Sequence, residues 1–163
     1  MTDELYTDRI PSPLGTLAGV VDARGALVAL GFEPYAGPAR VDAGRLEPVR
    51  AALARYFAGE LRAFELELAP AGTSFQLGVW RELVRIPYGA TISYGTLARR
   101  VGNAAAVRAV GRANGANPIA IVVPCHRVIG ADGTLTGYGG GLERKRALLE
   151  LEARVAGQAL ISA

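Results

Sequence analysis

Residues 93–115, SYGTLARRVGNAAAVRAVGRANG, hold two short apolar segments joined by a Gly-Asn pair. Ser93 is a good N-cap for the first segment, and Asn103 is a good N-cap for a second helix over residues 104–113. Two short helices joined by a Gly-containing turn are typical of a helix-turn-helix, although an ordinary helical hairpin has the same pattern.

The second predicted helix has one unusual face. Arg108 and Arg112 lie four residues apart, and alanine and glycine surround them. Small side chains let a helix backbone come close to another surface, so this face suits entry into a DNA groove. Tight packing against a neighbouring helix is the alternative interpretation.

Just after this region, residues 121–130 read IVVPCHRVIG and contain the only cysteine and the only histidine of the chain. The β-branched run at 119–123 predicts a buried strand or an extended core segment that Pro124 ends. Cys125 therefore lies where a buried segment stops. A thiolate is the reactive form of cysteine, and His126 is placed to take its proton directly or through one water. Neighbours in an extended strand face opposite sides, which favours the water-bridged relay.

Such a relay needs a third group to orient the histidine, and Glu152 is the candidate. The helix predicted from about residue 142 to 155 has an apolar stripe that contains Leu148. Glu152 falls on this buried side, where an unpaired carboxylate is costly, unless it belongs to a frayed helix end. Between these parts, the Gly-rich segment 133–142 is either a lid over the thiol or a simple linker.

The N-terminal part has a different pattern. It predicts a small antiparallel sheet with one helix: short strands within 9–33, a loop at 34–46, a helix at 47–58 and a strand at 64–69. A helix capped by Ser74 then follows a PAGT boundary at 70–73. We therefore expect an α+β protein with a scaffold domain at 1–70 and a mainly helical, winged-helix-like domain at 71–163.

Composition narrows the function classes. Residues 1–69 carry 7 Arg and 10 Asp/Glu, whereas residues 70–163 carry 11 Arg/Lys and 5 Asp/Glu. The second part is therefore where a polyanion would bind. One cysteine and one histidine cannot build a structural zinc site, and no apolar run is long enough to span a membrane. We expect no metal, no cofactor and a cytoplasmic protein.

Several motifs together resemble the O6-alkylguanine-DNA alkyltransferase family. They are PCHR at 124–127, ISYGTLA at 92–98, VRAVGRANGANP at 107–118, the Gly137-Tyr138 loop and RKRALLELE at 144–152. Their order and spacing match the family over about residues 73–152. The first 70 residues resemble it only in length and in their sheet-plus-helix pattern.

The resemblance implies repair of double-stranded DNA by direct reversal. The O6-alkylguanine base, and also O4-alkylthymine, would flip out of the duplex and transfer the alkyl group once, irreversibly, to Cys125. It further implies a monomer without a cofactor; cooperative binding on DNA stays open. In this family, the second helix of the helix-turn-helix enters the minor groove.

The resemblance also implies roles for individual residues. His126, through a water, would draw the proton of Cys125, Glu152 would orient His126, and Asn117 would brace the active-site turn. Tyr94 would meet the flipped nucleotide, and Arg108 would fill the space that the base left. The implied sets are Cys125, His126, Glu152 and Asn117 for catalysis, Tyr94, Arg108, Ala109, Arg112 and Arg127 for DNA binding, and Asn114, Val128, Tyr138 and Gly139 for the substrate pocket.

Two other classes compete with this interpretation. A Cys-His hydrolase would need an oxyanion hole and an Asn or Asp orienter, and no motif supplies them. A non-catalytic helix-turn-helix protein that senses DNA damage or regulates transcription would bind DNA without covalent change. The family's non-repairing members lack the cysteine, which this chain has.

Overall fold

The computed structural model describes residues 4–162, with side chains up to residue 157. The chain forms two compact units. Unit 1 takes the chain up to Ala71 together with Pro118–Ala120, and unit 2 takes Gly72–Asn117 and the chain from Ile121 onward. The predicted α+β class is confirmed. The small segment 118–120 differs from the predicted division, because it pairs with a strand of unit 1.

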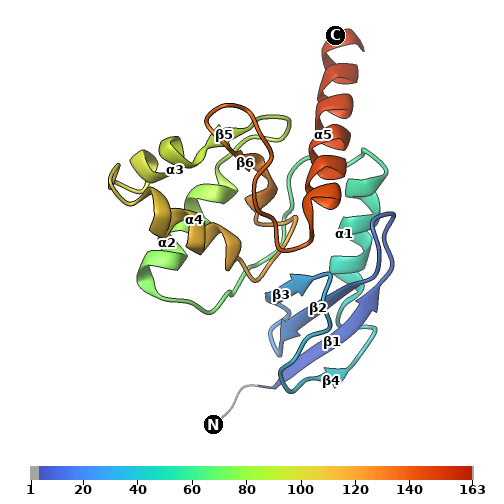
Figure 1. Ribbon diagram of the computed structural model, residues 1–163. Coiled ribbons are helices and arrows are strands. Elements are labelled where there is room, and N and C mark those ends of the chain that lie inside the picture. The colour runs from blue at the N-terminus through green and yellow to red at the C-terminus, as the bar shows by residue number, and fades with distance from the viewer. Residues whose placement is uncertain (1–3, 163) are drawn as a thin grey trace. The chain divides into compact units, whose positions relative to one another are not determined.

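Unit 1 is built around a four-stranded sheet in the order β3-β2-β1-β4 (Figure 1). Its strands are β1 (Leu5–Ile10), β2 (Leu17–Asp22), β3 (Leu27–Gly31) and β4 (Arg40–Val41). The first three pair antiparallel, and β4 adds to β1 in parallel. Gly15 (φ 125°) and Gly25 (φ 90°) make the two reversals, where a residue with a Cβ would be strained. The predicted meander is confirmed, whereas β4 lies inside the predicted loop.

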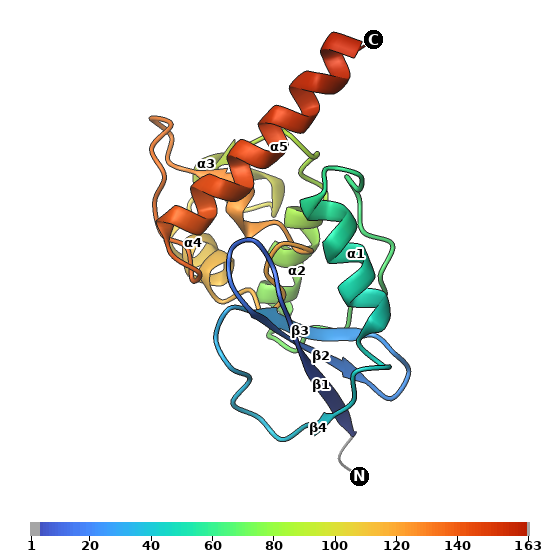
Figure 2. The same cartoon turned by 90° about the vertical axis from the view of Figure 1, so that its right-hand side faces the viewer.

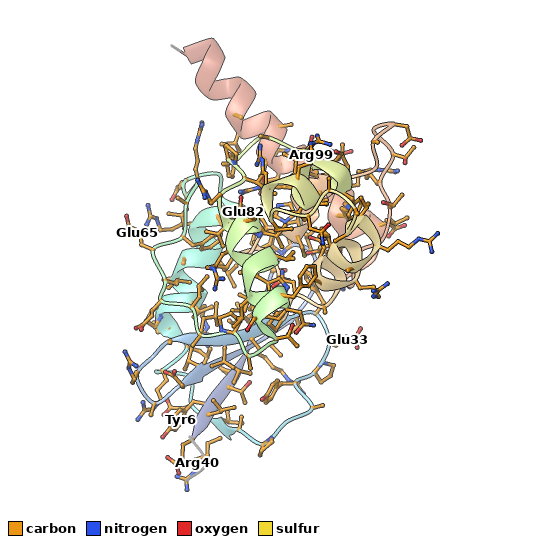
Figure 3. The ribbon with its side chains drawn as sticks, turned by 90° about the vertical axis from the view of Figure 1, so that its left-hand side faces the viewer. Tyr6, Glu33, Arg40, Glu65, Glu82 and Arg99 are labelled. Carbon is orange, nitrogen blue, oxygen red and sulfur yellow. The ribbon has the colours of Figure 1, made fainter. Side chains whose placement is uncertain are left out.

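One helix, α1 (Glu47–Phe57), lies against this sheet (Figure 2). It buries Val49, Leu53 and Tyr56, as the apolar spacing predicted. Where β4 pairs with β1, Tyr6 and Arg40 lie side by side (Figure 3). Tyr6 donates to the Glu4 carboxylate at 2.7 Å, and Arg40 forms an ion pair with the same carboxylate.

The predicted strand at 64–69 is wrong. Only Leu68 forms a bridge, with Leu27 of β3. The Leu27 amide donates to the Glu67 carbonyl at 2.8 Å, and the Ala69 amide donates to the Leu27 carbonyl. Pro70 follows directly and has no N–H to continue a ladder, so the alternating sequence yields one isolated contact.

Unit 2 is mainly helical. Its elements are α2 (Ser74–Val84), β5 (Ile92–Ser93), α3 (Tyr94–Arg100), α4 (Val107–Gly115), the 3-10 turn η1 (Cys125–Arg127), β6 (Val128–Ile129) and α5 (Leu142–Ser162). Figure 1 shows α2, α3 and α4 gathered together beside the parallel β5–β6 pair. Among the described residues, no helix is long and apolar enough to cross a membrane.

The helix starts show how local chemistry sets the boundaries. Thr73 caps α2 in place of the predicted Ser74, because it forms a reciprocal capping box with Gln76. Ser93 caps α3 by accepting from the Thr96 amide at 3.1 Å, as predicted. Asn103 instead accepts from the Ala105 amide in a turn, so α4 begins three residues later than predicted.

The predicted strand over residues 119–123 is also wrong, although the segment is buried. Ile119 makes a single bridge to Leu30, and the chain then turns at Ile121, whose φ is +71°. Positive φ is unfavourable for a β-branched side chain, so the packing of this buried residue must hold it there. The turn leads into η1 and thereby presents Cys125.

Candidate active site

The turn η1 places Cys125 and His126 in the interior of unit 2. The Cys125 residue is 8% exposed and His126 is fully buried. The Asn117 side chain donates to the Val123 carbonyl at 2.8 Å, so it braces the turn just before the cysteine. Asn117 therefore lies in the bracing position that the family resemblance implied.

Glu152 comes from α5 and joins this turn from the opposite side. Its Oε2 lies 2.8 Å from Nε2 of His126, and the carboxylate is 1% exposed. Since an ionised carboxylate only accepts hydrogen bonds, Nε2 must carry the proton of the neutral imidazole. The other ring nitrogen, Nδ1, then has a lone pair, and it has no hydrogen-bond partner among the described residues. His126 is therefore a neutral base whose Nδ1 can accept a proton.

The charges of this pair follow from burial and from hydrogen bonds. Burial alone raises the pKa of Glu152, but hydrogen bonds from His126 and Arg127, together with the charges of both residues, lower it to about 2. Burial lowers the pKa of His126, and the attraction of Glu152 only partly opposes this. At neutral pH the structure therefore holds an ionised Glu152 beside a neutral His126.

Cys125 rests as a thiol in this environment. Burial raises its pKa, while a hydrogen bond from the Asn117 side chain and the charge of Lys145 act in the opposite direction. A buried thiol needs a base at the moment of reaction. His126 Nδ1 is the neutral acceptor that the site provides.

Lys145 is a functional candidate that the sequence analysis missed. It is fully buried, and its ammonium donates to the carbonyls of Val128 at 2.7 Å, Thr136 at 2.8 Å and Gly137 at 3.3 Å. One side chain thus ties β6 to the Gly-rich loop. Its position seven residues before Glu152 is the signal that could have found it, since that spacing puts both on one face of α5.

The predicted pocket residues surround the cysteine in different ways. Val128 is buried in β6, Asn114 of α4 donates to the Cys125 carbonyl at 3.4 Å, and Gly139 is exposed in the loop. Burial raises the pKa of Tyr138, and a negative charge on Cys125 would raise it further, so Tyr138 stays a neutral phenol. In the described part of the chain, the Tyr138 hydroxyl and Asn114 Oδ1 have no hydrogen-bond partner.

The predicted DNA-binding residues lie on the helix-turn-helix, with one exception. Arg108 and Arg112 are exposed on α4, and Ala109 is half-buried between them. Tyr94, at the start of α3, donates from its hydroxyl to the Thr136 carbonyl at 3.2 Å. Figure 3 shows Arg99 on α3, a further exposed arginine.

The exception is Arg127. It is 6% exposed, and its guanidinium donates to Glu152 and to the Ile86 carbonyl. A DNA-contacting role does not fit a side chain whose donors are taken inside the protein. Among the described residues, no group of three or more His, Cys, Asp or Glu side chains could hold a metal ion.

Acid is expected to destabilise the protein through Glu152 and His126. Below pH 6.5 the unfolded chain protonates its histidine, whereas buried His126 stays neutral. Below pH 4.5 Glu152 becomes protonated in the unfolded chain, whereas in the folded protein its carboxylate stays ionised down to about pH 2. The unfolded state binds more protons in both ranges, so stability falls as pH falls, by about 2 kcal/mol for Glu152 alone between pH 7 and pH 3. Denaturant unfolding from pH 7 to pH 3 measures this. A flat profile, or an equal slope in Glu152→Gln, would contradict it.

Comparison with known proteins agrees with this geometry. Residues 74–154 match the family model described as 6-O-methylguanine DNA methyltransferase, DNA binding domain. A methylated-DNA–protein-cysteine methyltransferase of Mycobacterium tuberculosis is 52% identical over 147 residues, which cover 88% of this chain and 89% of that protein. The protein of the same name from Haemophilus influenzae is 47% identical over 155 residues, covering 91% and 86%.

A solved structure extends the similarity to the whole fold. The crystal structure of the M. tuberculosis alkyltransferase in complex with DNA has a TM-score of 0.86 and 49% sequence identity. The match covers 93% of this chain and 94% of that one. The similarity therefore includes both units.

Proposed function

The chain belongs to the methylated-DNA–protein-cysteine methyltransferase family, and from this premise we propose that Cys125 is the residue that accepts the alkyl group. The protein repairs DNA by direct reversal: it transfers an alkyl group from damaged DNA to a cysteine of its own. Its substrate and partner is alkylated duplex DNA. Cys125 is the only cysteine in the sequence.

The single observation that carries the assignment is the open Nδ1 of His126 beside a buried thiol. The thiol proton passes through one water to Nδ1, and Glu152 stabilises the imidazolium that forms. The Cys125 sulfur then attacks the alkyl carbon in line. The S–C bond forms while the C–O6 bond breaks, and the electron pair leaves with guanine, which takes up a proton.

The thioether product explains why the reaction occurs once. A C–S bond has no leaving group of comparable quality, and no second thiol of this chain can take the alkyl group. Each molecule is therefore consumed by one repair event.

The target atom lies inside the duplex, so the base must first be extruded, which requires roughly a few kcal/mol. We propose that α4 enters the minor groove and that Arg108 fills the space left by the base. This proposal is supported by the exposure of Arg108 on a face of small residues. In the same proposal, Tyr94, at the start of α3, contacts the extruded nucleotide, which is supported by its hydrogen bond to the Gly-rich loop. Val128, Tyr138, Gly139 and Asn114 line the pocket in this proposal.

Stoichiometry tests the proposed function. The protein is incubated with a fivefold excess of duplex containing O6-methylguanine, and restored guanine is counted. We expect one guanine restored per active protein molecule and no further repair. Binding without any restored guanine would favour a damage-sensing protein, and many turnovers per molecule would contradict transfer to a cysteine.

Replacing Arg108 by alanine is expected to slow transfer from duplex DNA about tenfold or more. The alanine side chain is too short to occupy the space that the extruded base leaves in the duplex, so the extruded state is less stable. Transfer from free O6-benzylguanine, which needs no flipping, should be unchanged. Arg112→Ala is the matched control: loss of one phosphate contact weakens binding and lowers the salt slope by about 0.9, with little effect on saturated rates. Equal losses with duplex and free base would contradict the role of Arg108.

Three finer features belong to the same proposal. We expect repair of O4-alkylthymine as well as O6-alkylguanine, a monomer, and a cytoplasmic location. A chain without a second cysteine depends on a reducing compartment to keep its one thiol active, which supports the location. Sedimentation of the free protein as a dimer would contradict the expected monomer. O4-methylthymine that persists in a duplex incubated with the protein would contradict the expected repair of that base.

A further inference from the structure

We propose that Arg127 is a positioning residue for alkyl transfer: it holds Glu152 ionised and correctly rotated, and through Glu152 it fixes the proton on Nε2 of His126. The inference rests on the proposed function of Cys125. It assigns to Arg127 a part in the reaction, in place of the DNA contact that the sequence suggested.

The Arg127 guanidinium binds the Glu152 carboxylate through two of its nitrogens. Arg127 Nε donates to Glu152 Oε1 at 2.7 Å, and Nη2 donates to Oε2 at 3.0 Å. Paired donation of this kind fixes the plane of the carboxylate as well as its position. Oε2 also accepts from His126 at 2.8 Å, so the same oxygen serves both partners.

Further contacts hold the Arg127 guanidinium in place. Arg127 Nη1 donates to the Ile86 carbonyl at 2.8 Å, just beyond the end of α2, and its guanidinium carbon lies 5.6 Å from the centre of the Tyr88 ring. Arg127 therefore connects three elements: η1, the end of α2 and α5. The orientation of Glu152 does not depend on α5 alone.

Without this cation, the site would change its protonation. Glu152 would be a buried carboxylate that has lost both hydrogen bonds from Arg127, and a buried carboxylate with less support takes up a proton more readily. A protonated Glu152 donates to Nε2, which moves the imidazole proton to Nδ1. Nδ1 could then no longer accept the thiol proton. The extra proton belongs to the hydrogen-bonded pair: whether it lies on Glu152 or on His126, Nδ1 of the imidazole carries a proton, and the charge of Arg127 opposes that uptake.

Other charged groups near His126 cannot replace Arg127. Lys145 on α5 directs its ammonium to three backbone carbonyls. Cys125 rests as a neutral thiol on the same turn, and Tyr138 of the Gly-rich loop rests as a neutral phenol, since burial raises the pKa of each. Among the groups that act on Glu152, Arg127 is the permanent cation.

The single histidine makes the test direct. Untagged protein labelled with ¹⁵N and ¹³C in histidine gives one imidazole signal set, which reports both tautomer and pKa by NMR. The variants are Arg127→Gln, which removes the charge, and Arg127→Lys, which keeps the charge without the paired donation. Arg146→Gln, an exposed position on α5, is the matched control. The transfer rate from O6-methylguanine duplex is measured from pH 5.5 to pH 8.5 for each.

We expect the wild type and Arg146→Gln to show the Nε2–H tautomer throughout this range. In Arg127→Gln, Nδ1 of His126 should become protonated at a pH about one unit or more higher than in the wild type, and transfer should fall about tenfold more at pH 6 than at pH 8.5. Compared with Arg127→Gln, Arg127→Lys should regain most of the transfer lost at low pH, because it keeps the charge. Its rate should still stay below that of the wild type, because lysine cannot donate two parallel hydrogen bonds to the carboxylate.

Folded Arg127 variants with an unchanged tautomer, pKa and pH profile would overturn the proposal, even if the rate falls uniformly, because a merely structural role predicts that uniform fall. If neither variant folds, the wild type decides: an Nδ1–H tautomer overturns the proposal, and an Nε2–H tautomer that persists to pH 5.5 supports it. The NMR result does not require transfer, so a wild type that fails to repair DNA would overturn the proposed function separately.

Discussion

Cys125→Ser is expected to abolish alkyl transfer from O6-methylguanine, by about a thousandfold or more, while the protein still folds and binds duplex DNA. A serine hydroxyl is far less acidic than a thiol, and burial of the residue disfavours the anion further. His126 can therefore not generate the nucleophile. The substitution is nearly isosteric and leaves the Asn117 brace in place.

The measurement is restored guanine per protein molecule under single-turnover conditions, with duplex affinity measured in parallel. Both proteins should bind the damaged duplex with affinities within about threefold, since the exposed arginines of α4 are untouched. Transfer at more than about a tenth of the wild-type rate would show that another side chain accepts the alkyl group.

Lys145→Met is expected to destabilise the protein by about 1 to 3 kcal/mol and to slow transfer about tenfold or more. Methionine fills a similar volume, but it leaves the carbonyls of Val128, Thr136 and Gly137 without their common donor. Of these three acceptors, the Val128 carbonyl is the buried one, and an unsatisfied buried acceptor costs about 1–3 kcal/mol. The Gly-rich loop then loses its tie to β6, and with it the fixed position of Tyr138.

Denaturant unfolding gives the stability change, and amide hydrogen exchange over residues 130–141 reports the freed loop. Arg146→Met is the control, because this exposed neighbour on α5 makes the same change of size and charge. A loss of stability below about 1 kcal/mol with unchanged exchange would contradict the role given to Lys145.

The reactive core of the site could be predicted from sequence because its signals are local. Cys125 and His126 are adjacent and unique in the chain, and Glu152 lies on the apolar face of a regular helix. The structure brings His126 and Glu152 into contact and buries both. Asn117 likewise braces the turn that it was expected to brace.

The errors have a common physical origin. The apolar run at 119–123 reports burial and the alternation at 64–69 reports one half-buried side, and each was taken as evidence for a strand. In the structure, Ile121 turns the first segment with a positive φ, and Pro70 stops the second after one bridge. Tertiary packing set the backbone in the first case, and the missing N–H of Pro70 ended the pairing in the second.

Arg127 and Lys145 could not be placed from sequence because charged residues are seldom fully buried without partners. Their partners are backbone carbonyls and a carboxylate that lie far apart in the chain: Ile86 and Glu152 for Arg127, and Val128 with Thr136 for Lys145. A motif beside a cysteine suggested a DNA contact, whereas the fold turns the arginine inward.

The central claim is transfer of the alkyl group to Cys125, and mass spectrometry of the protein after reaction tests it most directly. The wild type is incubated with duplex containing O6-methylguanine, and the intact mass and the peptide that contains residues 121–130 are measured. The account predicts one added methyl group, about 14 Da, on the Cys125 thiol. An unchanged mass with the damaged duplex bound would contradict it and leave Cys125 as a buried structural thiol.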